Sequence, residues 1–455
     1  MRRRAGTVLV GGAALALALT ACDSGGGGDL GGGGGGGDTD ADCADYEAYG
    51  TFEGATVTIS STISDPSEAD PLAESWADFS SCTGITIQHN GTNEFESQIY
   101  VQVEGGNAPN LAIFPQPGLL ARMVADGYVQ PADDAVVATA GEGLTEDWLS
   151  YGAIDGTQYG IPIMGSVKSF VWYSPAAFEE SGYVIPTTWD ELMTLTDQIA
   201  ADHGSETVKP WCSGIESGGA TGWAATDFLE DMVLRTAGPD VYDQWVNHEI
   251  PFNDPQIVEA LDATGSILQD PERVNGGIGD PRSIATTAWA EAGLQVLEDN
   301  CYLFRAASFF ESQLPEGTTV APDGDIYAFY LPSQTAEDQP LLVAGDYLAA
   351  FDTDEATIAV QNFMSSGLWA DTRVSLGGVT SPNSGVDPAN ASSDMLRQTL
   401  ELMQAESAVA RFDGSDLMPS AVGAGSFWTA MTDWVDGTQS TEEALTTVEE
   451  SWPTD

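Results

Sequence analysis

Residues 55–118 read ATVTISSTISDPSEADPLAESWADFSSCTGITIQHNGTNEFESQIYVQVEGGNAPNLAIFPQPG, and this stretch decides the fold class. Short apolar runs predict strands over 56–60, 85–89 and 110–114. Apolar residues at helical spacing separate these runs, and they predict helices over 67–81 and 94–103. Because strands and helices alternate, we expect an α/β fold with a largely parallel sheet.

The carboxyl ends of parallel strands meet at one edge of a sheet, where ligands bind. That rule places residues 64–68, 90–94 and 115–117 on a single rim. Two long extended runs follow later in the chain, over 159–173 and 341–347. Further helices are predicted over 119–126, 175–181, 189–201, 223–236, 254–268, 356–365, 391–403 and 427–435, and a last helix opens at the capping box Ser440–Glu443.

The charge balance is strongly acidic. Thirteen Lys and Arg face 70 Asp and Glu, which gives a net charge of −57. Removal of Arg2, Arg3 and Arg4 with a leader leaves 10 − 70 = −60. Such a surface repels phosphate backbones, so we exclude nucleic acid as a partner and expect a neutral, hydrogen-bonding ligand.

The N-terminus has the pattern of an export signal. Three arginines precede an apolar stretch from Thr7 to Ala21 that is too short to span a bilayer comfortably. The ending Leu19-Thr20-Ala21-Cys22 resembles the bacterial lipobox, whose cysteine is lipidated; the alternative is an ordinary cleavage site with a chance cysteine. Eleven of the 13 residues from 25 to 37 are glycine, which is typical of a flexible tether.

Four further cysteines remain: Cys43, Cys82, Cys212 and Cys301. An even number in an exported chain predicts two disulfides, for which three connectivities are open. A zinc site is the rival interpretation, but no CxxC spacing occurs and the three histidines are scattered. A calcium loop starting at Asp38 would have Cys43 where glycine is needed and Tyr49 where glutamate is needed. We therefore expect no metal and no cofactor.

Several segments together match the pattern of a known family: Thr83–Ile85, Ala108–Ala112, Phe114–Gly118, Tyr159–Pro162, Trp172–Tyr173, Pro186–Leu192, Phe252–Pro255, and Gly437 with Ser440–Leu445. In these segments the chain resembles the extracellular solute-binding proteins of bacterial ABC sugar importers, of the maltose-type class and its α-glucoside branch. Individually these segments are weak signals, but they occur in the family's order behind the lipobox. Asn110 departs from the aspartate usual in the family, and Ser174-Pro175 from the usual Asn-Lys.

The resemblance implies a two-lobed periplasmic-binding-protein-like fold with extended hinge strands and a helical C-terminal part. The implied domains are a signal peptide (1–21), a lipidated cysteine and tether (22–42), lobe 1 (43–164 and 346–395) and lobe 2 (165–345 and 396–455). Given these lobes, we predict the pairs Cys43–Cys82 and Cys212–Cys301. Each pair then lies within one lobe and leaves the hinge free to close.

The resemblance also implies a ligand site, because carboxylates, amides and flat rings bind sugar hydroxyls and C–H faces. Lys168 and Asp227 each have a second interpretation. Lys168 can instead be an ion-pair partner, and Asp227 can instead complement the N-terminus of a helix. Phe309 can equally be a core residue, as can the tryptophans. The candidate ligand-binding residues are Glu68, Asn93, Glu94, Gln116, Lys168, Thr221, Trp223, Asp227, Phe309, Asp346 and Trp428.

These observations predict a monomeric receptor on the extracellular face of the cell membrane, anchored by lipid on Cys22. It would bind a neutral oligosaccharide, an α-glucoside disaccharide, and deliver it to ABC permease subunits, with no catalytic residue of its own. The alternatives are a secreted glycoside hydrolase, which needs two carboxylates at a set separation, and a cell-wall lipoprotein that binds no sugar.

Overall fold

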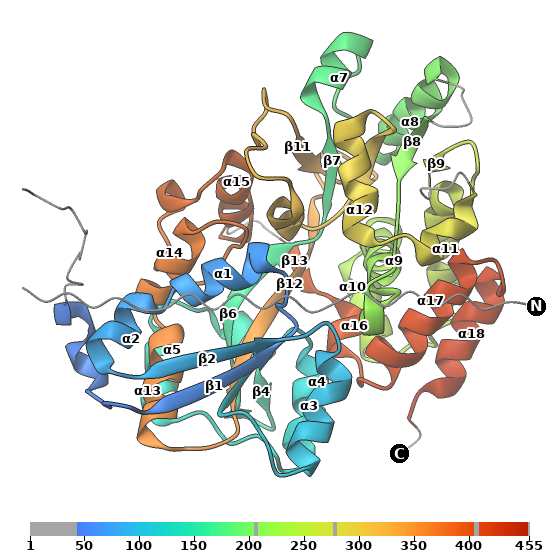
Figure 1. Ribbon diagram of the computed structural model, residues 1–455. Helices are drawn as coiled ribbons and strands as arrows, with labels where there is room; N and C mark the ends of the chain where they lie inside the picture. The colour runs from blue at the N-terminus through green and yellow to red at the C-terminus, as the bar shows by residue number, and fades with distance from the viewer. Residues whose placement is uncertain (1–42, 204–207, 276–279, 405–408, 454–455) are drawn as a thin grey trace, which may run out of the picture. The chain divides into compact units, whose positions relative to one another are not determined.

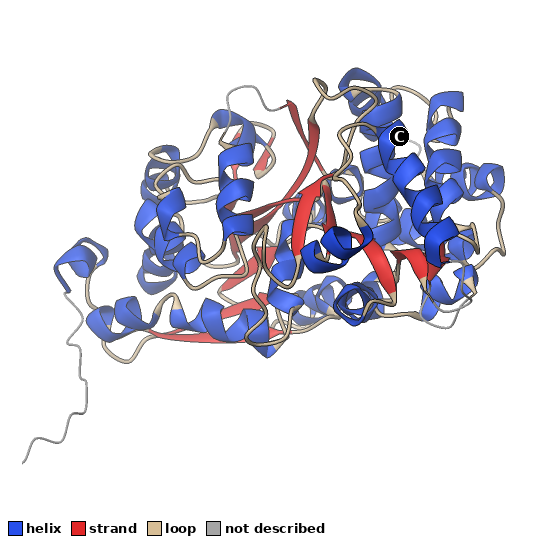
Figure 2. Ribbon diagram, turned by 90° about the horizontal axis from the view of Figure 1, so that it is seen from above, coloured by secondary structure: helices blue, strands red, loops and turns tan. Residues whose placement is uncertain are grey.

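Two β-sheets organise the described part of the chain (Figure 1). The computed structural model describes residues 43–203, 208–275, 280–404 and 409–453, so Cys22, the predicted signal peptide and the glycine-rich segment lie outside it. The described residues belong to one compact unit. In Figure 2 the strands run through the middle of this unit and helices lie outside them.

The first sheet has the strand order β13-β12-β3-β1-β2, and β6 also pairs with β12. β1 pairs in parallel with β2 and β3, as the strand–helix alternation predicts, whereas β12 runs antiparallel to β3 and β6. Every residue of β3 and of β6 is buried, because helices or the other strands cover both of their faces. The strands are β1 (Thr56–Ser61), β2 (Thr86–Gly91), β3 (Leu111–Phe114), β6 (Gly160–Val167), β12 (Pro340–Ala350) and β13 (Val409–Phe412).

The second sheet has the order β11-β7-β10-β8-β9, with β7 antiparallel to both of its neighbours. A separate hairpin pairs the short strands β4 (Ala153–Ile154) and β5 (Thr157–Gln158). The strands of the second sheet are β7 (Phe170–Tyr173), β8 (Lys209–Cys212), β9 (Val274–Asn275), β10 (Cys301–Arg305) and β11 (Tyr327–Tyr330).

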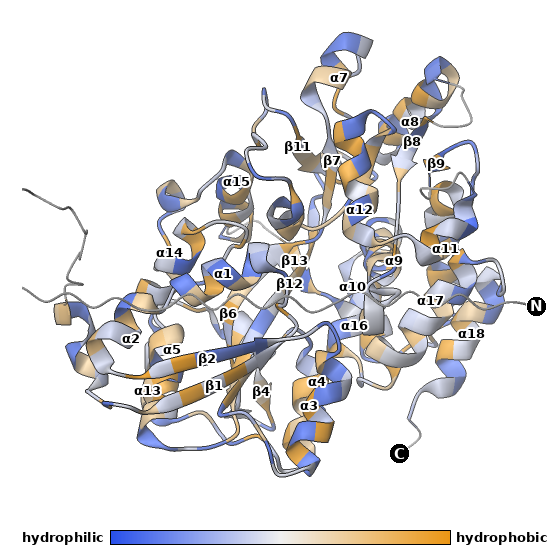
Figure 3. Ribbon diagram, in the orientation of Figure 1, coloured by the Kyte–Doolittle hydropathy of each residue, from blue (hydrophilic) through white to orange (hydrophobic). Residues whose placement is uncertain are grey.

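Most of the helices that pack on the first sheet begin at a side-chain N-cap, whereas α2, α3 and α4 do not. Asp65 caps the first of them by accepting a hydrogen bond from the Ser67 backbone, and Pro66 occupies the first turn. Figure 3 shows that helices such as α3 combine hydrophobic and hydrophilic residues, and Phe95 and Ile99 of α3 are buried. These helices are α1 (Pro66–Glu74), α2 (Ala77–Thr83), α3 (Phe95–Glu104), α4 (Pro117–Ala125), α5 (Asp134–Gly141), α6 (Glu146–Ser150), α13 (Glu355–Met364), α14 (Gly367–Ser375) and α15 (Asp394–Met403).

A second set of helices shares a core with the second sheet. The chain ends in the predicted helical part, whose last helix has the capping box that Ser440 and Glu443 predict. These helices are α7 (Pro175–Ser181), α8 (Trp189–His203), α9 (Trp223–Thr236), α10 (Pro239–Val246), α11 (Pro255–Leu268), α12 (Trp289–Leu294), α16 (Gly414–Leu417), α17 (Trp428–Val435) and α18 (Thr441–Ser451).

Two sequence predictions need correction. The predicted helix over 67–81 is two helices, because the chain leaves the helical path at Trp76 and the Ser75 hydroxyl donates to the Leu72 carbonyl. The extended run 159–173 is also two strands, β6 in the first sheet and β7 in the second. The two strands separate at Lys168-Ser169, so the chain passes from one sheet to the other at that point. The lobe boundaries set from the sequence stay a prediction.

Both predicted disulfides are present. Cys43–Cys82 joins the N-terminal 3₁₀ turn (Cys43–Tyr49) to α2, and Cys212–Cys301 joins the neighbouring strands β8 and β10. Their Cα–Cα distances of 5.4 and 5.5 Å fit ordinary disulfide geometry. Neither bond connects the two sheets. In the part of the chain that the structure describes, no helix is long and apolar enough to cross a bilayer.

Candidate functional site

A pocket of about 350 Å³ lies where the two sheets meet, and β6 and β12 form its floor. These strands pair antiparallel, so Met164, Gly165 and Ser166 lie opposite Asp346, Gly345 and Ala344. The volume falls in the range of small-molecule sites, roughly 300–1,000 Å³.

One wall of the pocket comes from the loops that follow β1, β2 and β3. Residues of all three predicted rim segments line it, because the parallel strands end at the same edge. Asp65 and Glu68 follow β1, Asn93 follows β2, and Gln116 follows β3.

The facing wall is largely aromatic. Trp223 opens α9, and its ring lies 5.2 Å from Trp289 and 5.9 Å from Phe309. Gly222 brings this turn close to α17, since its φ is +113° and a Cβ there would lie 2.3 Å from the Trp428 backbone oxygen. The glycine-rich turn in the sequence therefore places Trp223 and Trp428 at one site.

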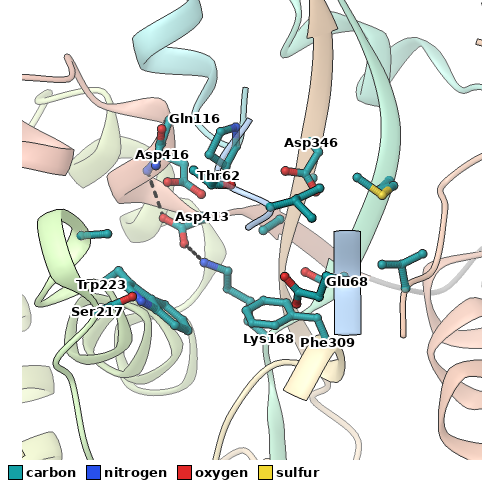
Figure 4. A pocket seen from close by; sticks show the side chains of 18 of the residues that line it. Thr62, Glu68, Gln116, Lys168, Ser217, Trp223, Phe309, Asp346, Asp413 and Asp416 are labelled. Carbon is teal, nitrogen blue, oxygen red and sulfur yellow. Dashed lines mark hydrogen bonds and ion pairs between the residues drawn. The ribbon is translucent and has the colours of Figure 1, made fainter. Parts of the chain in front are cut away.

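Lys168 stands at the base of the pocket, where the chain leaves β6 (Figure 4). Its Nζ lies 2.9 Å from Asp227 Oδ1 and also forms an ion pair with Asp413. Burial opposes the charged ammonium, but the two carboxylates together raise the pKa of Lys168 well above its ordinary value. Lys168 is therefore an ion-pair partner of buried carboxylates at the crossing between the sheets, which is the second interpretation that the sequence offered for it.

The network continues behind Lys168. Arg305 lies 3.2 Å from Asp227 and 2.5 Å from Asp231, and Asp231 accepts a hydrogen bond of 2.6 Å from the Ser169 hydroxyl. Ser169 in turn accepts from the Leu342 backbone at 2.9 Å. These contacts tie α9 to the crossing segment Lys168-Ser169 and to β12 of the first sheet.

Asp346 carries a carboxylate that has no hydrogen-bond partner among the described residues and faces the pocket from β12. Burial raises the pKa of Asp346 to about 7, and repulsion from Glu68 adds to the rise. Arg373 lies nearby, and burial lowers the pKa of its guanidinium to about 10 against the attraction of Glu68 and Asp346. A hydroxyl group that donates to Asp346 would satisfy this carboxylate.

Three further polar atoms lining the pocket are buried without a partner in the described residues: Gln116 Oε1, Arg373 Nε and Trp428 Nε1. Buried polar groups are normally hydrogen-bonded, so a water or a ligand atom would be needed to satisfy each of these atoms. Together they present one acceptor and two donors, which matches hydroxyl groups, since a hydroxyl both donates and accepts.

The structure brings eight of the predicted ligand residues together at this pocket. The eight are Glu68, Asn93, Gln116, Lys168, Trp223, Phe309, Asp346 and Trp428. Three others lie elsewhere. Asp227 is fully buried beneath Lys168, the Thr221 hydroxyl donates to the Gly218 carbonyl within its own turn, and Glu94 lines a smaller neighbouring cavity.

The sequence prediction missed Arg373, Asp413 and Asp416, all of which line the pocket. Asp413 follows β13 and caps a four-residue helix, a pattern that reads from sequence as an ordinary N-cap. Arg373 lies within α14 and has no distinguishing neighbours in the sequence. In the described part of the chain, no group of three or more His, Cys, Asp or Glu is arranged to hold a metal ion.

Comparison with known proteins decides the family. The family model described as "Bacterial extracellular solute-binding protein" matches residues 65–356. The chain belongs to this family. The resemblance to the solute-binding proteins of ABC sugar importers is thereby confirmed. Because the family consists of binding proteins, the choice against a glycoside hydrolase is confirmed as well.

Two curated relatives match over most of their length. The Osmoprotective compounds-binding protein GgtB of Synechocystis sp. is 38% identical over 85% of this chain and 90% of that protein. The Alpha-glucosides-binding periplasmic protein AglE of Rhizobium meliloti is 36% identical over 83% of this chain and 82% of that protein. The solute receptor AcbH superposes with a TM-score of 0.71 at 15% identity, covering 87% of this chain and 98% of that one, which shows the shared fold.

Proposed function

We propose that this solute-binding protein captures an α-linked glucoside, a neutral disaccharide or longer, and delivers it to the permease subunits of an ABC importer. The observation that carries the proposal is the set of buried polar atoms that lack a partner among the described residues, facing an aromatic wall in one pocket. Relatives named for α-glucosides and for osmoprotective compounds support the ligand class.

The pocket chemistry favours a neutral ligand. Six carboxylates line it: Asp65, Glu68, Glu96, Asp346, Asp413 and Asp416. Only two cations accompany them among the described lining residues, and Lys168 is already paired with Asp227 and Asp413. An anionic sugar would meet uncompensated negative charge, whereas neutral hydroxyls donate to carboxylates at little cost.

We further propose that the protein acts as a monomer, held on the outer face of the membrane by lipid on Cys22. The lipobox-like segment and the glycine-rich stretch support this anchor. Mass spectrometry of the protein from its native membrane would show a diacylglyceryl mass on an N-terminal Cys22 peptide. An unmodified N-terminus at another residue would refute the anchor.

Thermal unfolding of the purified protein across a sugar panel tests the ligand. Trehalose, maltose and sucrose are the candidates, and maltobionate supplies an anionic control of similar size. A ligand at 100 times its Kd stabilises the folded state by about 2.7 kcal/mol. We expect a concentration-dependent rise in Tm with at least one neutral glucoside and none with maltobionate. No rise with any glucoside would refute the proposal.

A further inference from the structure

A short 3₁₀ turn, Ser308–Gln313, carries part of the pocket's aromatic wall. The turn follows β10 of the second sheet, and Phe310 anchors it there, because its ring lies 4.9 Å from Phe304 of β10 and 5.3 Å from Trp172 of β7. The neighbouring Phe309 lines the pocket. A contact that holds this turn in place therefore also holds one side of the aromatic wall.

Helix α1 of the first sheet contacts the same turn. Glu68 Oε1, in the first turn of α1, accepts hydrogen bonds from the Ser312 hydroxyl at 2.8 Å and from Gln313 Nε2 at 3.2 Å. Gln313 Nε2 also lies 3.1 Å from Ser312 Oγ, so the three side chains are bonded to one another. Leu72 of α1 is buried in one core cluster with Val57 of β1. The three side chains therefore join a helix of the first sheet to a turn of the second.

The Glu68 carboxylate faces the pocket while it is held from behind. Both of its hydrogen bonds end on Oε1, and Oε2 accepts none from a described residue. Hydrogen bonds to an ionised group are the stronger kind, and two of them on one oxygen restrict the orientation of the whole carboxylate. Oε2 is therefore presented to the pocket in a fixed direction.

We propose that Ser312 and Gln313 are positioning residues for sugar capture. By holding Glu68 Oε1, they fix α1 against the turn that carries Phe309, and they keep the carboxylate and the aromatic wall in the binding arrangement before a sugar enters. The inference rests on the proposed function, because it assumes that the pocket takes a sugar. The contact itself can be measured without one.

A distance measurement by pulsed electron spin resonance on the sugar-free, full-length protein tests the contact. Spin labels at Glu74→Cys, on the last residue of α1, and at Glu316→Cys, just beyond the turn, occupy exposed positions and report the separation of the two elements. Ser150→Ala is the matched control for loss of a hydroxyl, because the Ser150 hydroxyl donates to the Asp147 carbonyl within α6.

Three variants alter the contact in different directions. Ser312→Ala removes one donor, Gln313→Glu places a second carboxylate beside Glu68, and Gln313→Lys places a cation there. We expect a narrow distance distribution in the unaltered protein, in the Ser150→Ala control and in Gln313→Lys. Gln313→Glu should give a longer and broader distribution, with Ser312→Ala between the two. A broad distribution in the unaltered protein, or the same distribution for Gln313→Glu and Gln313→Lys, would overturn the contact.

Stopped-flow tryptophan fluorescence with a bound glucoside measures the consequence for capture. Ser312 is not among the described residues that line the pocket, so Ser312→Ala should act only through Glu68. We expect it to raise the dissociation rate of the sugar at least fivefold, whereas Ser150→Ala should leave that rate unchanged. An unchanged rate in Ser312→Ala would overturn the positioning role. If the unaltered protein bound no glucoside, the proposed function would fail, and the distance measurement would still decide whether the contact exists.

Discussion

Replacing Lys168 with methionine should destabilise the protein strongly, because the change leaves buried carboxylates without their cation. The side chains of Lys168, Asp227 and Asp413 are 7%, 0% and 1% exposed. Asp227 keeps Arg305 at 3.2 Å. Asp413 keeps hydrogen bonds from the Ser415 hydroxyl at 2.8 Å and the Asp416 backbone at 3.0 Å, but it forms no ion pair with another described cation. The Asp413 carboxylate is therefore the group that the substitution destabilises most.

The expected loss is about 3–5 kcal/mol of unfolding free energy at pH 7, the usual cost of removing one partner of a buried ion pair. In the unaltered protein, burial opposes ionisation of Asp413, but Lys168 and its hydrogen bonds hold its pKa at about 2. Without Lys168 the folded-state pKa of Asp413 rises above its unfolded value. A group with a raised pKa favours folding at low pH, so the deficit should shrink as pH falls from 7 to 5.

Urea unfolding followed by tryptophan fluorescence measures this loss. Lys209→Met is the matched control, because Lys209 is 9% exposed and forms no ion pair with another described residue. Lys209→Met should lower the unfolding free energy far less than Lys168→Met at every pH. A Lys168→Met protein as stable as the original at pH 7, or a deficit that grows on acidification, would refute the assignment of Lys168 to the structural network.

Three further predictions concern other parts of the molecule. Asp346→Asn should raise the Tm of the sugar-free protein, because a carboxyl with a folded-state pKa of about 7 penalises folding increasingly as pH rises from about 4 to 7. The gain in Tm should be larger at pH 8 than at pH 5, and equal gains at the two pH values would contradict this prediction. Replacing both Cys43 and Cys82 with serine opens a 39-residue loop and should cost about 4 kcal/mol in urea unfolding, whereas an unchanged midpoint would rule this out. Gln116→Leu should weaken glucoside binding about tenfold in calorimetry with little change in Tm, and unaltered affinity would remove Gln116 from the site.

The parts of the fold that depend on local pattern could be predicted from the sequence. The strands near 56, 86 and 111 and the rim at their ends follow from alternation alone. The break between β6 and β7 could not be predicted, because both strands are apolar and the polar pair Lys168-Ser169 is unremarkable until the second sheet is known. The prediction of a single helix over 67–81 was wrong for a similar reason, since the apolar spacing continues across the break at Trp76.

The candidate site was predictable where the sequence offered a strand-end rim or a family motif. Glu68 and Asn93 lie on the predicted rim, Gln116 lies on the rim and in the family segment Phe114–Gly118, and all three line the pocket. Asp227 lies in the same helix as Trp223, but its partners are 59 and 78 residues away, so its burial in an ion network depends on tertiary structure. Arg373 was missed because burial among carboxylates, and not its neighbours in the sequence, gives it a place at the site.

A crystal structure of the protein with its best-binding glucoside tests the central claim most directly. The account predicts sugar density in the pocket above β6 and β12, with hydroxyls within hydrogen-bond distance of Gln116 Oε1, the Asp346 carboxylate and Trp428 Nε1. Sugar bound away from these three residues, or bound with them still unpartnered, would contradict it.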